Sequence, residues 1–329
     1  GNLPGTQFLQ PLPLDEQSIL SFHYPQYYYY LDMADRGGFM PAMLEFGLGT
    51  ADNPVVPGML HYSLLAAGSS VMAADILYSY PEMKLAFCPT GGFHHAGADY
   101  AAGFCYVNDA VLAISFLLQQ GVERILYLDI DAHHGDGVQF AFYEDNRVMN
   151  ISTHESGRTL FPWNSGFENE LGEDAGYGYN VNLPLAPGTN DEIFINAFDK
   201  IVPPLARAFD PQVCVAVIGV DSNFADPMTH LSLTNNGFSD SMLRIRDLAP
   251  KTLFLGGGGY NTDVIARAWT LAWAVLHDAE PRDEYLGEMG IMIDSSEADA
   301  GALRDTPPFI PPAKTAEAAA QARRVVSYI

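Results

Sequence analysis

The sequence predicts an α/β fold: a single domain with three αβα layers around a central, mostly parallel sheet. Short apolar runs of strand length alternate along the chain with segments of helical pattern, and such alternation produces right-handed crossovers between parallel strands. Acidic residues and histidines directly follow several of the apolar runs, as expected at the C-terminal ends of buried strands. No Gly/Ser linker or charged block divides the 329 residues, so one domain is expected over 1–329.

Composition narrows the function classes. A net charge of -24 argues against a nucleic-acid backbone or an anionic membrane surface as partner, whereas a basic peptide would be attracted. No apolar run is expected to span a membrane, and the first residues lack the basic and apolar regions of a signal peptide, so a cytoplasmic location is predicted. The three cysteines are odd in number and lie in apolar surroundings, which indicates reduced core residues.

The first fifty residues are rich in Pro, Gly and aromatic side chains and are expected to form an atypical, shortened N-terminal part. Four consecutive tyrosines, Tyr27 to Tyr30, should pack against the main body at a partly wet boundary. Each has an apolar ring to bury and a hydroxyl that needs a partner.

From residue 60 onward the periodicity predicts helices and strands in turn. Apolar runs of about four to eight residues bounded by turn residues indicate strands, and longer runs with apolar positions three and four apart indicate helices. Asn190 provides an N-cap for the helix that starts at Asp191. In order, the predicted elements are a helix at 60–78, a strand at 85–88, a helix at 109–119, a strand at 125–129, a helix at 138–143, strands at 148–152 and 179–183, the helix from Asp191, a strand at 213–220, a helix at 239–248, a strand at 252–255 and a helix at 262–276. Residues 277–329 are expected to be a C-terminal extension that packs on the domain.

The end of the strand at 125–129 carries the strongest chemical signal. Asp131 and His133 are two residues apart, so in extended backbone both side chains leave on the same side and can converge on one cation. Imidazole nitrogen with carboxylate oxygen suits zinc or a similar divalent ion. Asp129 shares that face, and Asp136 follows between two glycines. A single Asp-x-His is more often a capped strand end, so partners elsewhere must decide.

Other strand ends supply those partners. His94 and His95 follow the strand at 85–88, Asp221 follows the strand at 213–220, and four glycines followed by Tyr260 come after the strand at 252–255. Because the C-terminal ends of parallel strands meet at one edge of a sheet, these side chains are expected to form one site.

These residues resemble the zinc-dependent histone deacetylases, particularly class I and its bacterial relatives, within the arginase/deacetylase fold. The resemblance covers about residues 45–276 and lies in four motifs: Gly-Gly-Phe-His-His-Ala at 91–96, Gly-Phe-Cys-Tyr-Val-Asn-Asp at 103–109, Asp-Ile-Asp-Ala-His-His-Gly-Asp-Gly at 129–137 and Gly-Gly-Gly-Gly-Tyr-Asn at 256–261. It implies a hydrolase that removes acetyl or other acyl groups from lysine side chains of peptides or proteins.

The resemblance also implies residue roles. Asp131, His133 and Asp221 would hold one catalytic zinc, with iron as an alternative, and leave coordination positions open. His94 and His95 would be the acid/base pair, oriented by Asp129 and Asp136 respectively. Tyr260 would donate a hydrogen bond to the oxyanion.

Substrate and potassium sites are implied in the same way. The substrate-binding residues would be Asp52, Gly103, Phe104, Phe161, Met228 and Gly258, with Phe104 and Phe161 as the two walls of a narrow tunnel. Ordinary core packing remains the alternative for the two phenylalanines, and a turn-forming role for Asp52. One potassium ion would be held by Asp129, Asp131, His133, Ser152 and Thr153, and a second near Phe142, Asp145, Val148 and Tyr179.

The chain departs from the family pattern mildly at 219–221, where Gly-Val-Asp replaces Gly-Ala-Asp, and more strongly in two other places. Most of the strand and helix with which family chains usually open is missing, which leaves one edge of the sheet uncertain. After Phe161-Pro162 the usual Gly-Thr-Gly is replaced by Trp163-Asn164-Ser165-Gly166, and the indole of Trp163 could reshape the rim.

Three other functions are alternatives to this one. An arginase-like enzyme with two manganese ions would need acids at positions 135 and 223, where this chain has Gly135 and Asn223. A catalytically inactive acetyl-lysine reader would usually have lost a metal ligand or Tyr260. An acetylpolyamine or small-molecule amidohydrolase with the same mechanism stays open, as do the physiological substrate and the oligomeric state.

Overall fold

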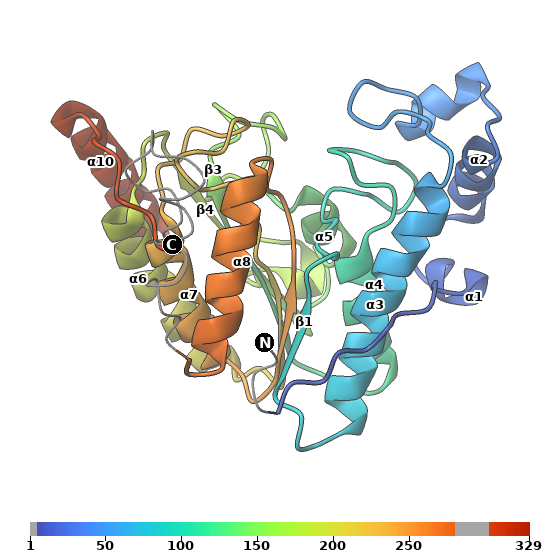
Figure 1. Cartoon of the computed structure of the whole chain (residues 1–329), viewed down its shortest axis with the longest axis horizontal. Coiled ribbons are helices and arrows are strands. Elements are labelled where there is room, and N and C mark those ends of the chain that lie inside the picture. Colours follow the sequence, from blue (N-terminus) through green and yellow to red (C-terminus); the bar gives the residue numbers. More distant parts are fainter. Residues whose placement is uncertain (1–4, 280–302) are drawn as a thin grey trace, which may run out of the picture.

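A computed structural model of the chain describes residues 5–279 and 303–329 (Figure 1). Its centre is one six-stranded sheet, β1-β6-β5-β2-β3-β4, in which every pair of neighbours is parallel. The predicted α/β class with a parallel sheet is therefore confirmed. The strands are β1 (Leu85–Cys88), β2 (Ile125–Asp129), β3 (Val148–Glu155), β4 (Asn180–Leu185), β5 (Val213–Val217) and β6 (Thr252–Leu255).

Helices cover both faces of the sheet. One face packs against α6 (Asp191–Phe209), α7 (Asn235–Arg246), α8 (Thr262–Leu276) and α10 (Pro312–Tyr328). The other packs against α3 (Met59–Ser79), α4 (Asp109–Gln119) and α5 (Asp136–Ala141). Alternate residues of β2 show why both layers form: Leu126 and Leu128 point into the first apolar cluster, and Ile125 and Tyr127 into the second.

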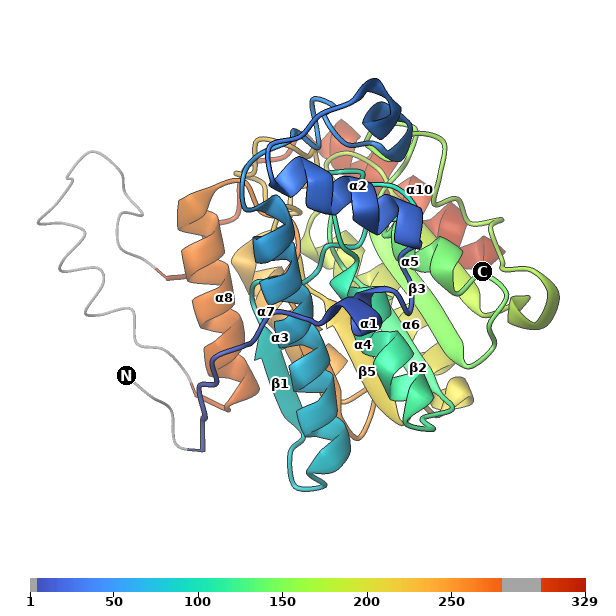
Figure 2. The same ribbon diagram turned by 90° about the vertical axis from the view of Figure 1, so that its right-hand side faces the viewer.

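The N-terminal part forms a third apolar cluster against α3. It contains α1 (Glu16–Ile19), α2 (Pro25–Asp35) and the 3-10 helix η1 (Pro41–Phe46), and Figure 2 shows α2 lying across one end of α3. The four tyrosines fall within α2, a helix that the sequence did not predict. Tyr27 is fully buried and donates its hydroxyl to the Tyr106 carbonyl, whereas Tyr29 is exposed, so the run spans the expected wet boundary.

Several predicted boundaries differ from the structure, and two of them have a clear physical cause. The strand predicted to reach residue 220 ends at Val217, because the next residues turn toward the glycine loop: the N–H of Ile218 bonds to the Gly256 carbonyl and that of Val220 to the Gly258 carbonyl. The helix predicted at 239–248 begins at Asn235, where the side chain of Thr234 caps it by accepting from the Asn236 N–H. The cap at Asn190 formed as predicted.

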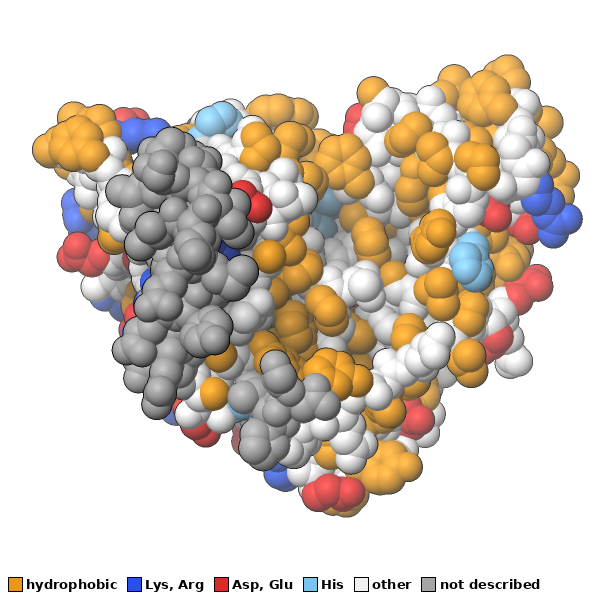
Figure 3. Space-filling view, in the orientation of Figure 1, with side chains coloured by type: hydrophobic (Ala, Val, Ile, Leu, Met, Phe, Trp, Pro, Cys, Tyr) orange, Lys and Arg blue, Asp and Glu red, His pale blue; other side chains and the backbone are white. Residues whose placement is uncertain are grey.

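Strand β1 forms the edge of the sheet that the sequence left uncertain. Its side chains are only partly buried up to Cys88, and Figure 3 shows apolar side chains gathered in the hollow between α8 and α3 where β1 lies. Contrary to expectation, α3 is also long and apolar enough by composition to cross a membrane. Half of its most apolar window is buried, and it packs on β1 and α4 as a core helix does.

Candidate active site

Three potential metal ligands converge beyond the C-terminal ends of β2 and β5. His133 Nδ1 lies 2.8 Å from Asp221 Oδ2 and 3.2 Å from Asp131 Oδ1. All three side chains are buried, and their ligand atoms lie within 4.8 Å of one another. Because β2 and β5 are adjacent parallel strands, residues 88 positions apart in the sequence meet here.

This cluster is short of positive charge. Burial alone would lower the pKa of His133, but Asp131 and Asp221 outweigh it and raise that pKa well above its usual value. Burial and the charge of Asp131 raise the pKa of Asp221 to about 7, whereas His94 and His133 outweigh burial and lower the pKa of Asp131. The two carboxylates thus compete for the same cationic neighbour. One imidazole nitrogen with two carboxylates, buried together, fits a divalent ion such as zinc.

The glycine loop after β6 approaches these carboxylates closely. The Gly258 N–H donates to Asp131 Oδ2 at 2.6 Å, and a Cβ at Gly258 would lie 2.3 Å from Asp221 Oδ2. In the segment that follows β5, a Cβ at Gly219 would lie 2.0 Å from Asp131 Oδ2. Any side chain at either position would displace a ligand, so glycine is required for the close approach.

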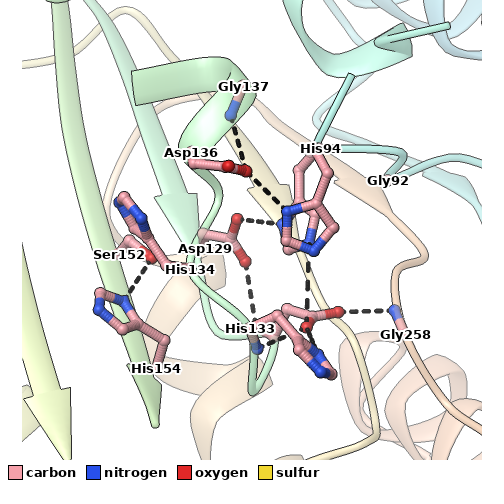
Figure 4. A network of polar contacts seen from close by, with 12 residues as sticks. Gly92, His94, Asp129, His133, His134, Asp136, Gly137, Ser152, His154 and Gly258 are labelled. Carbon is pink, nitrogen blue, oxygen red and sulfur yellow. Dashed lines mark hydrogen bonds and ion pairs between the residues drawn. The ribbon is translucent and has the colours of Figure 1, made fainter. Parts of the chain in front are cut away.

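His94 and His95 form a hydrogen-bonded pair beside these three residues. Figure 4 shows His94 in the same polar network as Asp129, His133 and Asp136. Their Nε2 atoms are 3.1 Å apart. His94 Nδ1 lies 2.7 Å from Asp129 Oδ2, and His95 Nδ1 lies 2.7 Å from Asp136 Oδ1. Each imidazole is therefore oriented by its own carboxylate, in the pairing that the resemblance implied.

The two histidines have opposite charge tendencies. Burial would lower the pKa of His94, but Asp129 and Asp131 outweigh it and raise the pKa to about 9. Burial and the neighbouring charge of His94 lower the pKa of His95 to about 4. Near neutral pH, His94 is then an imidazolium that donates from Nε2, and His95 is neutral, with its Nε2 lone pair accepting and its Nδ1–H donated to Asp136.

Aromatic rings surround this polar centre. The Phe161 ring packs edge-on against His95 with centroids 5.0 Å apart, and Tyr260 lies between Phe104 at 5.9 Å and His133 at 6.3 Å. Gly103 has φ +51, and a Cβ there would lie 2.4 Å from the His95 ring. The structure therefore brings the predicted tunnel residues to the mouth of the candidate metal site.

Phe104 and two neighbouring apolar side chains, Trp163 and Met228, are partly exposed around this centre and are called the rim here. Phe104, Trp163 and Met228 expose 45%, 61% and 43% of their surfaces. Asp52 is exposed, and its neighbour Asn53 donates a side-chain hydrogen bond to the Cys105 carbonyl, which ties this segment to the Phe104 loop.

The predicted potassium residues lie in two groups. Thr153 Oγ1 donates to the Asp129 carbonyl, and Ser152 Oγ lies 2.9 Å from His154 Nδ1, so both adjoin the metal-ligand turn. In the second group, the carbonyls of Phe142 and Asp145 accept the N–H groups of Asp145 and Val148 in the turn before β3, and the Tyr179 carbonyl accepts from the Asn150 N–H. Potassium binding stays a prediction for both groups.

The positions that a second transition metal would need are otherwise occupied. A Cβ at Gly135 would lie 2.4 Å from Asp129 Oδ2, which leaves no room for an acid. The Asn223 amide donates to Asp305 Oδ2 at 2.8 Å, and its oxygen accepts from the Ala225 N–H. The site therefore offers ligands for one such ion among the residues described.

Sequence reasoning missed Tyr127, which is fully buried and donates its hydroxyl to Asp129 Oδ2 at 2.6 Å. It thus supports the carboxylate that orients His94. The two-residue period of β2 places Tyr127 and Asp129 on one face, so this partner could have been found from the pattern.

A buried network that the sequence did not reveal holds the loop from Ser156 to Glu170. Glu170 accepts the N–H groups of Gly166 and Phe167, at 3.1 and 2.9 Å, and the side-chain amide of Gln139 at 2.7 Å. Gln139 Oε1 lies 2.9 Å from His134 Nε2, and His134 Nδ1 lies 3.0 Å from Ser165 Oγ. The loop that carries Phe161 and Trp163 is thereby tied to the turn that carries His133 and Asp136.

Comparisons with known proteins agree with this geometry. The family model for the histone deacetylase domain matches residues 1–276. The chain is 37% identical over 281 residues to the acetoin utilization protein AcuC of Bacillus subtilis, covering 83% of this chain and 72% of that protein. It is 38% identical to histone deacetylase B of Dictyostelium discoideum over 274 residues, or 83% and 64% of the two chains.

Two solved structures are similar. An HDAC homologue complexed with SAHA has a TM-score of 0.84 and 34% identity, covering 96% of this chain and 88% of that one. An HDAC homologue from Aquifex aeolicus has a TM-score of 0.85 and 33% identity, covering 97% and 88%.

Proposed function

Because the chain belongs to the histone deacetylase family, we propose that it is a metal-dependent hydrolase that removes acetyl or other acyl groups from lysine side chains of peptides or proteins. One observation carries the proposal: the Asp131, His133 and Asp221 cluster, the hydrogen-bonded histidine pair and the Tyr260 ring all meet at the mouth of one site.

The cluster would hold a divalent ion, with zinc as the first candidate and iron as the alternative. When bound, such an ion supplies Lewis acidity that polarises the acyl carbonyl and makes water more acidic. The side chains of the protein do the remaining work.

The histidine pair accepts a proton from the attacking water and returns it to the leaving amine. Neutral His95 is the proton acceptor: its Nε2 lone pair exchanges the His94 N–H for the proton of the attacking water. His94, held as an imidazolium by Asp129, stabilises the negative charge that develops nearby. The pair returns the proton to the lysine nitrogen as the amide C–N bond breaks, leaving a free amine and a carboxylate product.

Tyr260 completes the site as the oxyanion donor. Burial and the charges of Asp131 and Asp221 raise the pKa of its phenol, so the hydroxyl keeps its proton and can donate it to the carbonyl oxygen. A donor aimed at the oxyanion acts mainly in the transition state, and its loss usually costs about 10² to 10³ in turnover.

A peptide substrate suits the rim better than a polyamine. Phe104, Trp163 and Met228 present partly exposed apolar surface, which matches the side chains that flank an acylated lysine. A polyamine carries further cationic amines along its length, and of the residues named here around the rim only Asp52 offers them a carboxylate.

The test is to assay the purified protein on acyl-lysine peptides and on acetylpolyamines, with its metal content measured on the same sample. We expect peptide deacylation that a chelator abolishes and zinc restores. Tyr260→Phe should lower kcat by about 10² to 10³ while peptide affinity, metal content and melting temperature change little. Tyr177→Phe, which removes a hydroxyl from a tyrosine exposed to 66%, is the control. Full activity in folded Tyr260→Phe would refute the mechanism, and activity on polyamines alone would refute the substrate class.

A further inference from the structure

The Tyr260 side chain is only loosely enclosed. Its ring meets Phe104 and His133 edge-on, and 39% of the residue is exposed. Packing of this kind leaves the direction of the hydroxyl dependent on where the backbone places Cα and Cβ. The four residues before it are glycines, whose side chains can lend the loop no contacts.

Besides the Gly256 and Gly258 carbonyls, which accept from Ile218 and Val220, three N–H groups of this loop donate hydrogen bonds that position its backbone. The Gly256 N–H bonds to the Cys88 carbonyl, and the Gly258 N–H bonds to Asp131 Oδ2. The third lies at the tyrosine itself, where the Tyr260 N–H donates to Asp226 Oδ2 at 2.8 Å.

Asp226 is well placed to hold that position. It is 6% exposed, and its second oxygen accepts the Met228 N–H at 2.9 Å, so each oxygen receives one backbone donor from a different rim segment. Charge-assisted hydrogen bonds of this kind are shorter and stronger than neutral ones. A further contact follows directly, because the Asn261 side chain donates to the Ala225 carbonyl at 3.1 Å. The Tyr260 loop is thus attached to the segment that carries Met228.

We propose that Asp226 is a positioning residue: through the Tyr260 N–H it sets the direction of the Tyr260 hydroxyl and links it to the Met228 segment of the rim. The inference rests on the proposed function for its kinetic consequence. The carboxylate of Asp226 accepts backbone N–H groups and is hydrogen-bonded to none of Asp131, His133 and Asp221, so its effect would be exerted through Tyr260. Misplacement of a catalytic group by about 1 Å can cost 10²-fold in rate.

The main test replaces Asp226 by Asn, which keeps the shape of the side chain. One of its two N–H donors, that of Tyr260 or that of Met228, would then face an NH₂ group and lose its hydrogen bond. We expect kcat to fall about 10- to 100-fold with KM changed less than about threefold. In a Tyr260→Phe background the same change should cost less than about threefold, because the hydroxyl it positions is already absent. Full additivity of the two substitutions would overturn the proposal.

The hydrogen bond from the Tyr260 N–H to Asp226 is called the clamp here. Asp226→Ser separates the effect of this clamp from an effect on local folding. A serine hydroxyl can still accept the N–H two residues ahead and so keep the turn at Met228, but it is too short to reach Tyr260. We expect it to reproduce the kinetic loss of Asp226→Asn while melting close to the parent protein. Parent-like kinetics in this variant would contradict the clamp.

Asp191→Asn is the matched control. Asp191 also bonds a backbone N–H and a hydroxyl, both of Thr234, at 2.8 and 2.6 Å, and burial raises the pKa of both aspartates. Asp191 contacts none of the site residues, so Asp191→Asn should leave kcat unchanged. It should also leave unchanged the non-additivity between the Asp226→Asn and Tyr260→Phe substitutions. An equal kinetic loss in this control would show that any buried carboxylate produces the effect, and would overturn the proposal.

Amide hydrogen exchange makes the inference independent of the activity. The Tyr260 amide should exchange at least about tenfold faster in Asp226→Asn than in the parent, and unchanged in Asp191→Asn. If the parent hydrolyses no acyl-lysine substrate but this exchange pattern is found, the proposed function fails and the clamp stands. Unchanged protection of the Tyr260 amide in Asp226→Asn would refute the clamp whatever the activity.

Discussion

The charge of a histidine in this protein is set by the carboxylates around it. His94 and His95 are adjacent in sequence and similarly buried, yet Asp129 and Asp131 hold one as a cation, whereas burial and that cation keep the other neutral. A proton donor and a proton acceptor are thus made from two identical side chains. Burial, where no carboxylate outweighs it, predicts the pH response of a histidine outside the catalytic centre.

His23 is that residue. It is 1% exposed, its Nε2 accepts the Asn108 N–H, and burial lowers its pKa to about 4. The unfolded chain, with a histidine pKa near 6.5, therefore binds more protons between about pH 4 and 6.5, so stability is complete above this window and falls as the pH falls through it. From pH 7 to pH 5 the loss from His23 should be about 2 kcal/mol.

His23→Gln keeps an acceptor for Asn108 and removes the titration. Chemical denaturation of both proteins at pH 7 and pH 5 should show a smaller loss of unfolding free energy on acidification in the variant. Parallel pH profiles for the two proteins would exclude His23 as a proton-linked site.

At the scale of elements, local sequence patterns predicted the strands and the cap at Asn190, but they did not predict the cap of α7 at Thr234. All six strands were found because short apolar runs of strand length stand between turn residues in the sequence. The start of α7 was missed because Asn235, Asn236 and Gly237 resemble a loop, although Gly237 packs against the Asp191 carboxylate and Thr234 caps the helix. Tertiary contacts, which the local pattern does not contain, outweigh weak propensities there.

The loop from Ser156 to Glu170 should depend on one carboxylate for its order. Glu170→Gln would turn one oxygen that accepts an N–H into a donor, and an unsatisfied partly buried donor costs about 1 to 3 kcal/mol. Because this loop carries Phe161 and Trp163, we expect KM for acyl-lysine peptides to rise more than kcat falls. Steady-state kinetics and amide exchange over residues 157–170 measure both effects.

Glu173→Gln is the control for this loop, since Glu173 is exposed and three residues away. It should leave KM and exchange unchanged. An increase in KM of the same size in both variants would show that net charge near the rim is responsible, rather than the hydrogen bonds from the loop backbone to Glu170.

At the scale of the whole molecule, the site was predictable wherever it follows the ends of strands. His94, Asp131, His133, Asp221 and Tyr260 each follow an apolar strand, and parallel pairing brings such ends together without further information. The sequence did not single out Asp226, Glu170 and Asp305. Asp226 and Glu170 form hydrogen bonds that hold loops, and Asp305 bonds to Asn223, 82 positions away in the chain. Contacts between loops have no period, so only the folded structure reveals them.

Asp305 links the C-terminal segment to the segment that carries Asp221. Its buried carboxylate accepts the Asn223 side chain and the Asn235 N–H, both at 2.8 Å, and pairs with Arg267 of α8. Beyond it, α10 buries Ala318, Ala322 and Val325 against the sheet layer. Residues at the far end of the chain therefore brace the segment behind Asp221, one of the predicted metal ligands.

Asp305→Asn should accordingly lower the unfolding free energy by about 2 to 4 kcal/mol, because it leaves the half-buried Arg267 unpaired and turns one acceptor into a donor. Asp199→Asn breaks a comparable carboxylate–arginine pair with Arg244, but both side chains there are at least one-third exposed, so its cost should stay below about 1 kcal/mol. Denaturant unfolding measures the difference, and titration with zinc should show weaker binding in Asp305→Asn alone, since Asn223 lies two residues from Asp221. Equal stability of the two variants would mean that the C-terminal segment only covers the domain and does not brace the metal-ligand segment.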